Sequence, residues 1–210
     1  MAGVALMWLL VSVGGAENPG FKQYEQYLSA LGADGSASPG WGRAALVVTG
    51  LAILVVLPPL AVWRSLLGVL AGVAGLAALG MAAWPMTCPG SARFCTQTVP
   101  GQSLDIAHTT AVLVFVTAVI SLSLAGARQM AAGSAARPRL WPAVPAAIAI
   151  VVLIGPSLLT VTGLPQRMLL LAAQVLVVAL GAAAASELQR RHRREARSRA
   201  ADLVRIDSVL

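Results

Sequence analysis

Charged residues are scarce in this chain of 210 residues. Asp, Glu, Lys and Arg make up 11% of the sequence, whereas a soluble domain carries about a quarter. Hydrophobic residue types make up 58%, and the mean hydropathy is +0.79. A chain of this size has too little core volume to bury so much apolar surface. The composition therefore excludes a water-soluble globular protein and predicts that the lipid bilayer is the solvent.

Cysteine and histidine are also rare, with two of each. Cys88 and Cys95 are too far apart in the sequence for a redox C-x-x-C motif, and with so few histidines they do not form a zinc-type ligand set. Two cysteines in one loop on the oxidising side of a membrane usually pair. We therefore expect a structural disulfide between Cys88 and Cys95, and we expect no metal and no cofactor.

Lysine is almost absent, because 14 of the 15 basic residues are arginine, and seven of the 15 lie in the segment 190–205. This run follows an apolar segment and contains no aromatic residues. That pattern favours an anionic membrane surface over nucleic acid as the partner, although the pI is near 11.0. A helix that docks onto another protein is the alternative. The arginines expected to lie on anionic lipid of the inner leaflet are Arg190, Arg191, Arg193, Arg194 and Arg197.

Five segments are long and apolar enough to cross a bilayer, which needs about 20 residues: 44–62, 66–84, 107–127, 141–161 and 168–186. A sixth segment, Ala2–Gly15, would reach only about 21 Å across a hydrocarbon core of about 30 Å. Its lack of a basic n-region favours a short first span over a signal peptide, and a start upstream of Met1 is a third possibility.

The sequence therefore predicts an all-α bundle of six transmembrane spans over residues 1–186, followed by a basic helical tail over 187–210. The connections on one side of the six spans carry 11 Lys and Arg residues and those on the other side carry four. By the positive-inside rule the first side is cytoplasmic and so is the C-terminus. Abundant Arg and Ala are typical of a GC-rich bacterial genome, so we expect a multi-pass protein of a bacterial inner membrane.

Small and polar residues mark features within the spans. Gly68, Gly72 and Gly75 have the spacing of a close-packing helix face, which predicts packing inside the bundle, with homodimerisation as the alternative. Pro58 and the adjacent Pro59 should bend or end the second span. The amide of Gln174 lies deep in the sixth span and is expected to bond to a Thr or Ser of the fourth or fifth.

Residues 21–31, with the sequence FKQYEQYLSAL, place their apolar side chains at helical spacing. This pattern predicts a short amphipathic helix at the outer membrane interface, with Gly32 as the residue after its last turn. A plug packed over the bundle is the alternative interpretation, and the two are compatible. Trp41 and Trp84 are expected to anchor the adjacent spans at the interface.

Asp105 and His108 are three positions apart at the start of the fourth span, so they share one face of its helix. Arg167 opens the sixth span on the same outer side, and Glu25 belongs to the outer loop. We expect an Asp105–Arg167 ion pair with His108 on the same face. Two interpretations remain open: a structural clamp, or a polar site that recognises a lipid headgroup, moves a proton or performs hydrolysis. No catalytic residue is assigned, because the spacing selects no nucleophile.

Four short motifs carry a family resemblance: Ser29–Ala33, Trp84-Pro85, Asp105–His108 and Gly163–Arg167. In this order the chain resembles, over residues 1–186, the bacterial six-span family catalogued as domain of unknown function 998, which is distantly similar to eukaryotic membrane proteins of the Frag, DRAM and Sfk type. The resemblance implies a six-span fold and a role in membrane lipid organisation or sensing.

We therefore expect a non-enzymatic protein that interacts with or regulates membrane lipids. The alternatives are a small transporter or membrane enzyme that uses the outer Asp, His and Arg cluster, and an accessory subunit of a membrane complex.

Overall fold

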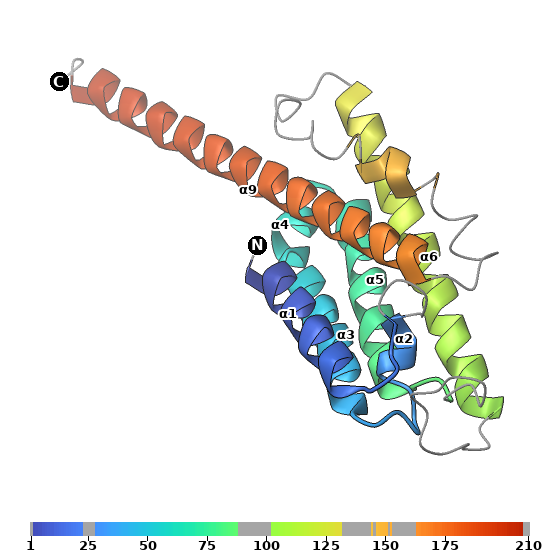
Figure 1. Ribbon diagram of the computed structural model, residues 1–210. Helices are drawn as coiled ribbons and strands as arrows, with labels where there is room; N and C mark the ends of the chain where they lie inside the picture. The colour runs from blue at the N-terminus through green and yellow to red at the C-terminus, as the bar shows by residue number, and fades with distance from the viewer. Residues whose placement is uncertain are drawn as a thin grey trace.

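The computed structural model describes residues 2–22, 28–87, 102–131, 144, 146–150, 152 and 163–207, without the side chains of 102–104, 130–131, 163, 165 and 200–207. Its regular structure is helical apart from one isolated bridge, so the all-α prediction is confirmed for the described residues (Figure 1). The helices are α1 (Ala2–Glu17), α2 (Leu28–Leu31), α3 (Pro39–Val55), α4 (Leu57–Trp63), α5 (Ser65–Ala83), α6 (Gln102–Ala131) and α9 (Gly163–Asp207).

The helices form an elongated bundle in which α3 packs between α1 and α5, and α5 packs against α6 (Figure 1). α9 crosses this layer, contacting α2 near its first turn and α4 further along. The bundle has two ends, which we name by their contents. The α2 end contains α2, the last turn of α1 and the first turns of α3 and α6. The tail end contains α4 and the first turn of α1, and the basic part of α9 extends beyond it (Figure 1).

Within the described residues, four helical stretches are long and apolar enough to cross a membrane: Pro39–Trp63, Ser65–Ala83, Asp105–Gln129 and Gln166–Arg199. They correspond to four of the expected spans, and α1, with 16 residues, corresponds to the short first span. The expected span at 141–161 lies mostly outside the described residues. Its described part, 146–150, is helical and contributes Ala146 and Ile150 to the main core.

The prolines of the second span act at its helix boundary. α3 ends at Val55, Val56 forms a turn, and α4 begins at Leu57 with proline in its first turn. Proline disrupts the interior of a helix but suits its first positions, where no backbone donor is needed. The expected bend is therefore present one residue before the α4 helix, which runs on to Trp63.

The small-residue face of α5 packs within the chain. A Cβ added at Gly68 would lie 2.6 Å from the Cα of Ala61 in α4, and one at Gly75 would lie 2.8 Å from the side chain of Leu54 in α3. A Cβ added at Gly72 would lie 3.1 Å from the side chain of Leu57 in α4. The approach at Gly68 is to backbone and leaves no room for a side chain, and all three glycines let α5 contact α3 and α4 closely.

The segment around α2 lies inside the α2 end. Phe21 belongs to a buried cluster with Leu31, and Leu28 is also buried. Residues 23–27 of the expected amphipathic helix lie outside the described residues, but the burial of its described apolar residues favours the plug interpretation. Gly32 follows the last helical residue as expected, yet its φ is not positive. The two backbones approach closely here: a Cβ at Gly32 would lie 3.1 Å from the Arg43 nitrogen, and one at Gly42 would lie 2.3 Å from the Gly32 nitrogen.

The basic tail continues the last span without a helix break. α9 has 45 residues and passes from apolar sequence into the arginine-rich segment. Glu187 and Arg191 are four positions apart and form an ion pair, with the Arg191 Nε 3.8 Å from the Glu187 Oε1. His192 lies 3.9 Å from a carboxylate oxygen of Glu195. These contacts between successive turns are of the kind that supports an exposed helix.

Candidate functional site

A network of hydrogen bonds joins the helix ends at the α2 end of the bundle. The Nδ2 of Asn18 donates to the Gly14 carbonyl oxygen at 2.7 Å, and its Oδ1 accepts from the Ser38 amide at 3.0 Å. Asn18 is buried, so it both ends α1 and fixes the start of α3. Sequence reasoning did not single it out. The Asn-Pro-Gly sequence after the first apolar segment is the turn signal that would have indicated it.

A second part of the network joins the turn after α2 to α3 and to the segment after α5. Arg43 forms an ion pair with Asp34, and its Nε donates to the Gly32 carbonyl oxygen at 3.1 Å. The Asp34 amide donates to the Met86 carbonyl oxygen at 3.0 Å. The backbone that follows α5 is therefore held against the turn that follows α2.

Asp105 makes its hydrogen bonds to this same segment. One carboxylate oxygen accepts from the Thr87 amide at 2.7 Å, and the other accepts from the Thr87 hydroxyl at 2.5 Å. Asp105 lies in the first turn of α6, where a carboxylate also interacts favourably with the helix dipole. The ion pair expected with Arg167 is not among the contacts of the described residues. Instead, Thr87 on the segment after α5 donates a hydrogen bond to each carboxylate oxygen of Asp105.

Arg167 is buried at the start of α9, with 7% of its surface exposed. Its guanidinium carbon lies 5.8 Å from the centre of the Phe21 ring, within the range of a cation–π interaction. The neighbouring Gln166 accepts a hydrogen bond from the Leu28 amide at 2.6 Å. Both residues therefore hold α9 against the segment around α2. Glu25, which was expected above them, lies outside the described residues.

His108 is 5% exposed, and its Nδ1 lies 2.9 Å from the Trp84 carbonyl oxygen. A carbonyl oxygen only accepts, so Nδ1 carries a proton and donates this hydrogen bond. This Nε2 is buried and has no hydrogen-bond partner among the described residues. A buried polar atom left without a partner typically costs about 1–3 kcal/mol. Among the described residues, His108 is thus the member of the expected Asp105, His108 and Arg167 set that contributes an unpartnered ring nitrogen.

A small cavity of about 90 Å³ lies beneath α2. Ser29 and Gln166 are polar residues of its lining, and Val112 and Phe115 of α6 line it one and two turns beyond His108. Ligand pockets are usually about 300–1,000 Å³, so this cavity is too small for a typical ligand. Among the described residues there is no group of three or more His, Cys, Asp and Glu that could hold a metal ion. Cys88 and Cys95 lie outside these residues, so their disulfide stays a prediction.

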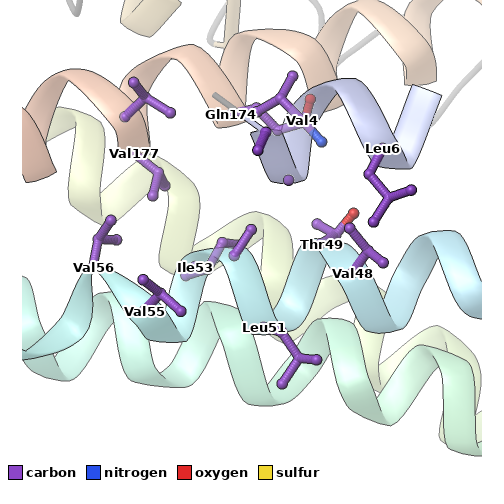
Figure 2. Close-up of a pocket in the computed structure, with 14 residues that line it drawn as sticks. Val4, Leu6, Val48, Thr49, Leu51, Ile53, Val55, Val56, Gln174 and Val177 are labelled. Carbon is purple, nitrogen blue, oxygen red and sulfur yellow. The ribbon is translucent and has the colours of Figure 1, made fainter. Parts of the chain in front are cut away.

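A larger hollow of about 450 Å³ lies between α1, α3 and α9, and we call it the α1–α3–α9 groove (Figure 2). Its labelled walls in Figure 2 are Val, Leu and Ile side chains, with Thr49 and Gln174 as the polar exceptions. The residues that line the groove are Ala2, Gly3, Val4, Leu6, Val48, Thr49, Leu51, Ala52, Ile53, Val55, Val56, Gln174, Val177 and Val178.

The polar groups of the groove are held by the protein. The Thr49 hydroxyl donates to the Ala45 carbonyl oxygen at 2.8 Å. The Gln174 Oε1 accepts from the Trp8 Nε1 at 3.2 Å. The expectation that Gln174 bonds to another helix is therefore met by α1. The fifth span, whose Thr or Ser was one expected partner, lies mostly outside the described residues. With these groups engaged, the groove presents a mostly apolar surface.

Together these features define the class of this protein. It is a helical membrane protein whose helix ends are joined by a polar network at one end and whose side carries an apolar groove.

A family model described as "protein of unknown function (DUF998)" matches residues 1–183, so the chain belongs to the DUF998 family. No curated protein and no solved structure shows significant similarity to the chain.

Proposed function

We propose that this protein is a non-enzymatic, multi-pass protein of a bacterial inner membrane that binds membrane lipids. The observation that carries the proposal is the α1–α3–α9 groove, an apolar hollow of about 450 Å³ in the side of the bundle. Its volume falls in the range of pockets that hold small-molecule ligands. Its lining is that of a site for hydrocarbon, with few polar groups and no charged residue.

The position of the groove supports an acyl chain as the ligand. Its walls belong to apolar helices, and Leu6, Leu51 and Val55 on its lining are exposed to the surroundings of the bundle. In a bilayer those surroundings are lipid tails. A tail that enters the groove gains contacts with atoms on several sides, whereas an empty hollow would forfeit them. Lipid binding there is therefore favoured by packing alone.

The positive charges at the tail end indicate which end of the bundle faces the cytoplasm. Arg64 precedes α5, Arg128 lies in the last turns of α6, and the arginines of α9 extend beyond the bundle on this side. Positive residues gather on the cytoplasmic side of bacterial inner-membrane proteins. We therefore orient the tail end and the C-terminus toward the cytoplasm.

The experiment is to purify the protein from membranes in a mild detergent and to measure retained lipid by native mass spectrometry. Val178→Phe adds a ring inside the groove, and Val69→Phe makes the same change on the exposed surface of α5, outside the groove. We expect retained phospholipid in the wild type and in Val69→Phe, and at least a fivefold loss in Val178→Phe. Equal lipid occupancy in the two variants, both folded by gel filtration, would contradict the proposal.

The buried Nε2 of His108 favours a second candidate function, a small transporter or membrane enzyme that uses the α2 end. Asn in place of His108 retains a donor near the position of Nδ1 and removes the ring nitrogen Nε2. If this second function is correct, His108→Asn should fold normally and fail to complement a deletion strain. If the protein only binds lipid through the groove, His108→Asn should keep both its retained lipid and complementation.

A further inference from the structure

We infer that the ligand of the groove is an anionic phospholipid from the leaflet at the tail end, with its phosphate near the arginines of α9. This inference rests on the proposed lipid binding and adds the chemical class of the lipid. Three properties of the described residues support it: the position of the groove along the bundle, the distance from the groove to the basic segment, and the charge of that segment.

The groove lies in the half of the bundle nearer the tail end. On α1 it is lined by residues 2–6, which form the first turns, and on α3 by residues 48–56, which form the second half and the junction with α4. On α9 it is lined by residues 174–178, beyond the first turns that contact α2. An acyl chain in the groove therefore comes from a lipid whose headgroup is at the tail end.

The distance along α9 from the groove to the basic segment is close to the thickness of one leaflet of the bilayer. From Gln174, the α9 residue in the groove nearest the α2 end, to Arg190 is 16 residues, or about 24 Å at the helical rise, and from Val178 it is about 18 Å. Half of a bilayer, including its headgroups, is about 20–22 Å thick. Because α9 crosses the bundle obliquely (Figure 1), it spans somewhat less depth than these lengths, and a lipid whose chain ends beside Gln174 has its phosphate near the level of Arg190.

The basic segment has the charge to prefer an anionic headgroup. Between residues 187 and 199 the sequence contains six arginines and two glutamates. Arg191 has a side chain that is 53% exposed although it lies near Glu187, so its guanidinium is accessible to a phosphate. Guanidinium groups bind phosphate oxygens with paired, charge-assisted hydrogen bonds. Basic residues at this level therefore favour anionic over zwitterionic lipid.

The test uses the full-length protein in nanodiscs of equimolar phosphatidylcholine and phosphatidylglycerol, with retained lipids measured by native mass spectrometry. We expect the retained lipid to be enriched in phosphatidylglycerol about fivefold or more, which is the preference that a single arginine near the surface provides. A quadruple variant, which we call the charge-neutral variant, removes four of the positive charges and leaves the residues of the groove unchanged. Its substitutions are Arg190→Gln, Arg191→Gln, Arg193→Gln and Arg194→Gln.

The charge-neutral variant should retain lipid but lose the enrichment, and the matched Arg→Lys variant at the same four positions should keep most of it. If the wild type retains lipid without enrichment, or if the charge-neutral variant keeps the enrichment, the inference is wrong and the proposed lipid binding stands. If the wild type retains no lipid of either kind, both are wrong. Loss of lipid in Val178→Phe with normal enrichment per bound lipid would agree with both.

Discussion

Replacing Asp105 by Ala should destabilise the protein because it removes two hydrogen bonds from Thr87. The effect should not depend on Arg167. The carboxylate accepts two hydrogen bonds from Thr87, at 2.7 and 2.5 Å. Hydrogen bonds to a charged group contribute about 1.5–3 kcal/mol each when well shielded, and Asp105 is only half-buried. We therefore expect a loss of about 2–3 kcal/mol for the pair, which corresponds to a fall in the melting temperature of roughly 4–12 °C.

A double-mutant cycle separates the two partners. Thr87→Val removes the hydrogen bond from the hydroxyl and keeps the one from the amide. The double mutant with Asp105→Ala should therefore lose about 1 kcal/mol less than the sum of the two single mutants. Arg167→Met should add to Asp105→Ala within about 0.5 kcal/mol, because the two side chains share no contact among the described residues. Unfolding free energies from denaturant titration in detergent micelles provide the measurement. Strong coupling to Arg167 together with additivity at Thr87 would refute the reasoning.

Three further predictions concern other parts of the chain. Gly42→Ala should lose about 2 kcal/mol in the same titration, because its Cβ would lie 2.3 Å from the Gly32 nitrogen, whereas Gly40→Ala, with nothing within 4 Å, should change stability by less than about 1 kcal/mol. A membrane-impermeant thiol reagent should label Cys88 and Cys95 only after reduction, and ready labelling of both in untreated cells would contradict the disulfide. A C-terminal alkaline phosphatase fusion should be inactive and a C-terminal fluorescent protein fusion should fluoresce; the reverse result would overturn the orientation.

The fold class was predictable because hydrocarbon leaves the backbone few options. Within a bilayer every backbone donor and acceptor must be satisfied inside the protein, so a long apolar segment is a helix. The segments at 44–62, 66–84, 107–127 and 168–186 therefore indicated helices that the structure contains. The helix boundary near Pro58 was predictable for a related reason. Proline has no backbone N–H to donate, so a helix boundary lies close to it regardless of how the neighbouring helices pack.

The polar contacts between helices were less predictable, because a sequence specifies charges without the path of the connecting segments. Asp105 had a plausible opposite charge in Arg167, yet the chain after α5 brings Thr87 to it first. Gln174 was recognised as a buried amide in need of a partner, but the partner is the indole of Trp8 in a helix far away in the sequence. The groove had no sequence signal, since it arises from ordinary Val, Leu and Ala residues where three helices fail to fill the space between them.

The unbroken course of α9 has a mechanical consequence. Because the arginine-rich turns extend a helix that is already formed in the bundle, they avoid the unfavourable first step of helix formation that a free basic peptide faces. The stretch from Glu187 to Asp207 is about 30 Å long at the helical rise. A tilt of the transmembrane part of α9 by about 5° would therefore displace the far end of this segment by nearly 3 Å, so a small change in how α9 packs against α2 and α4 would produce a larger movement of the basic turns.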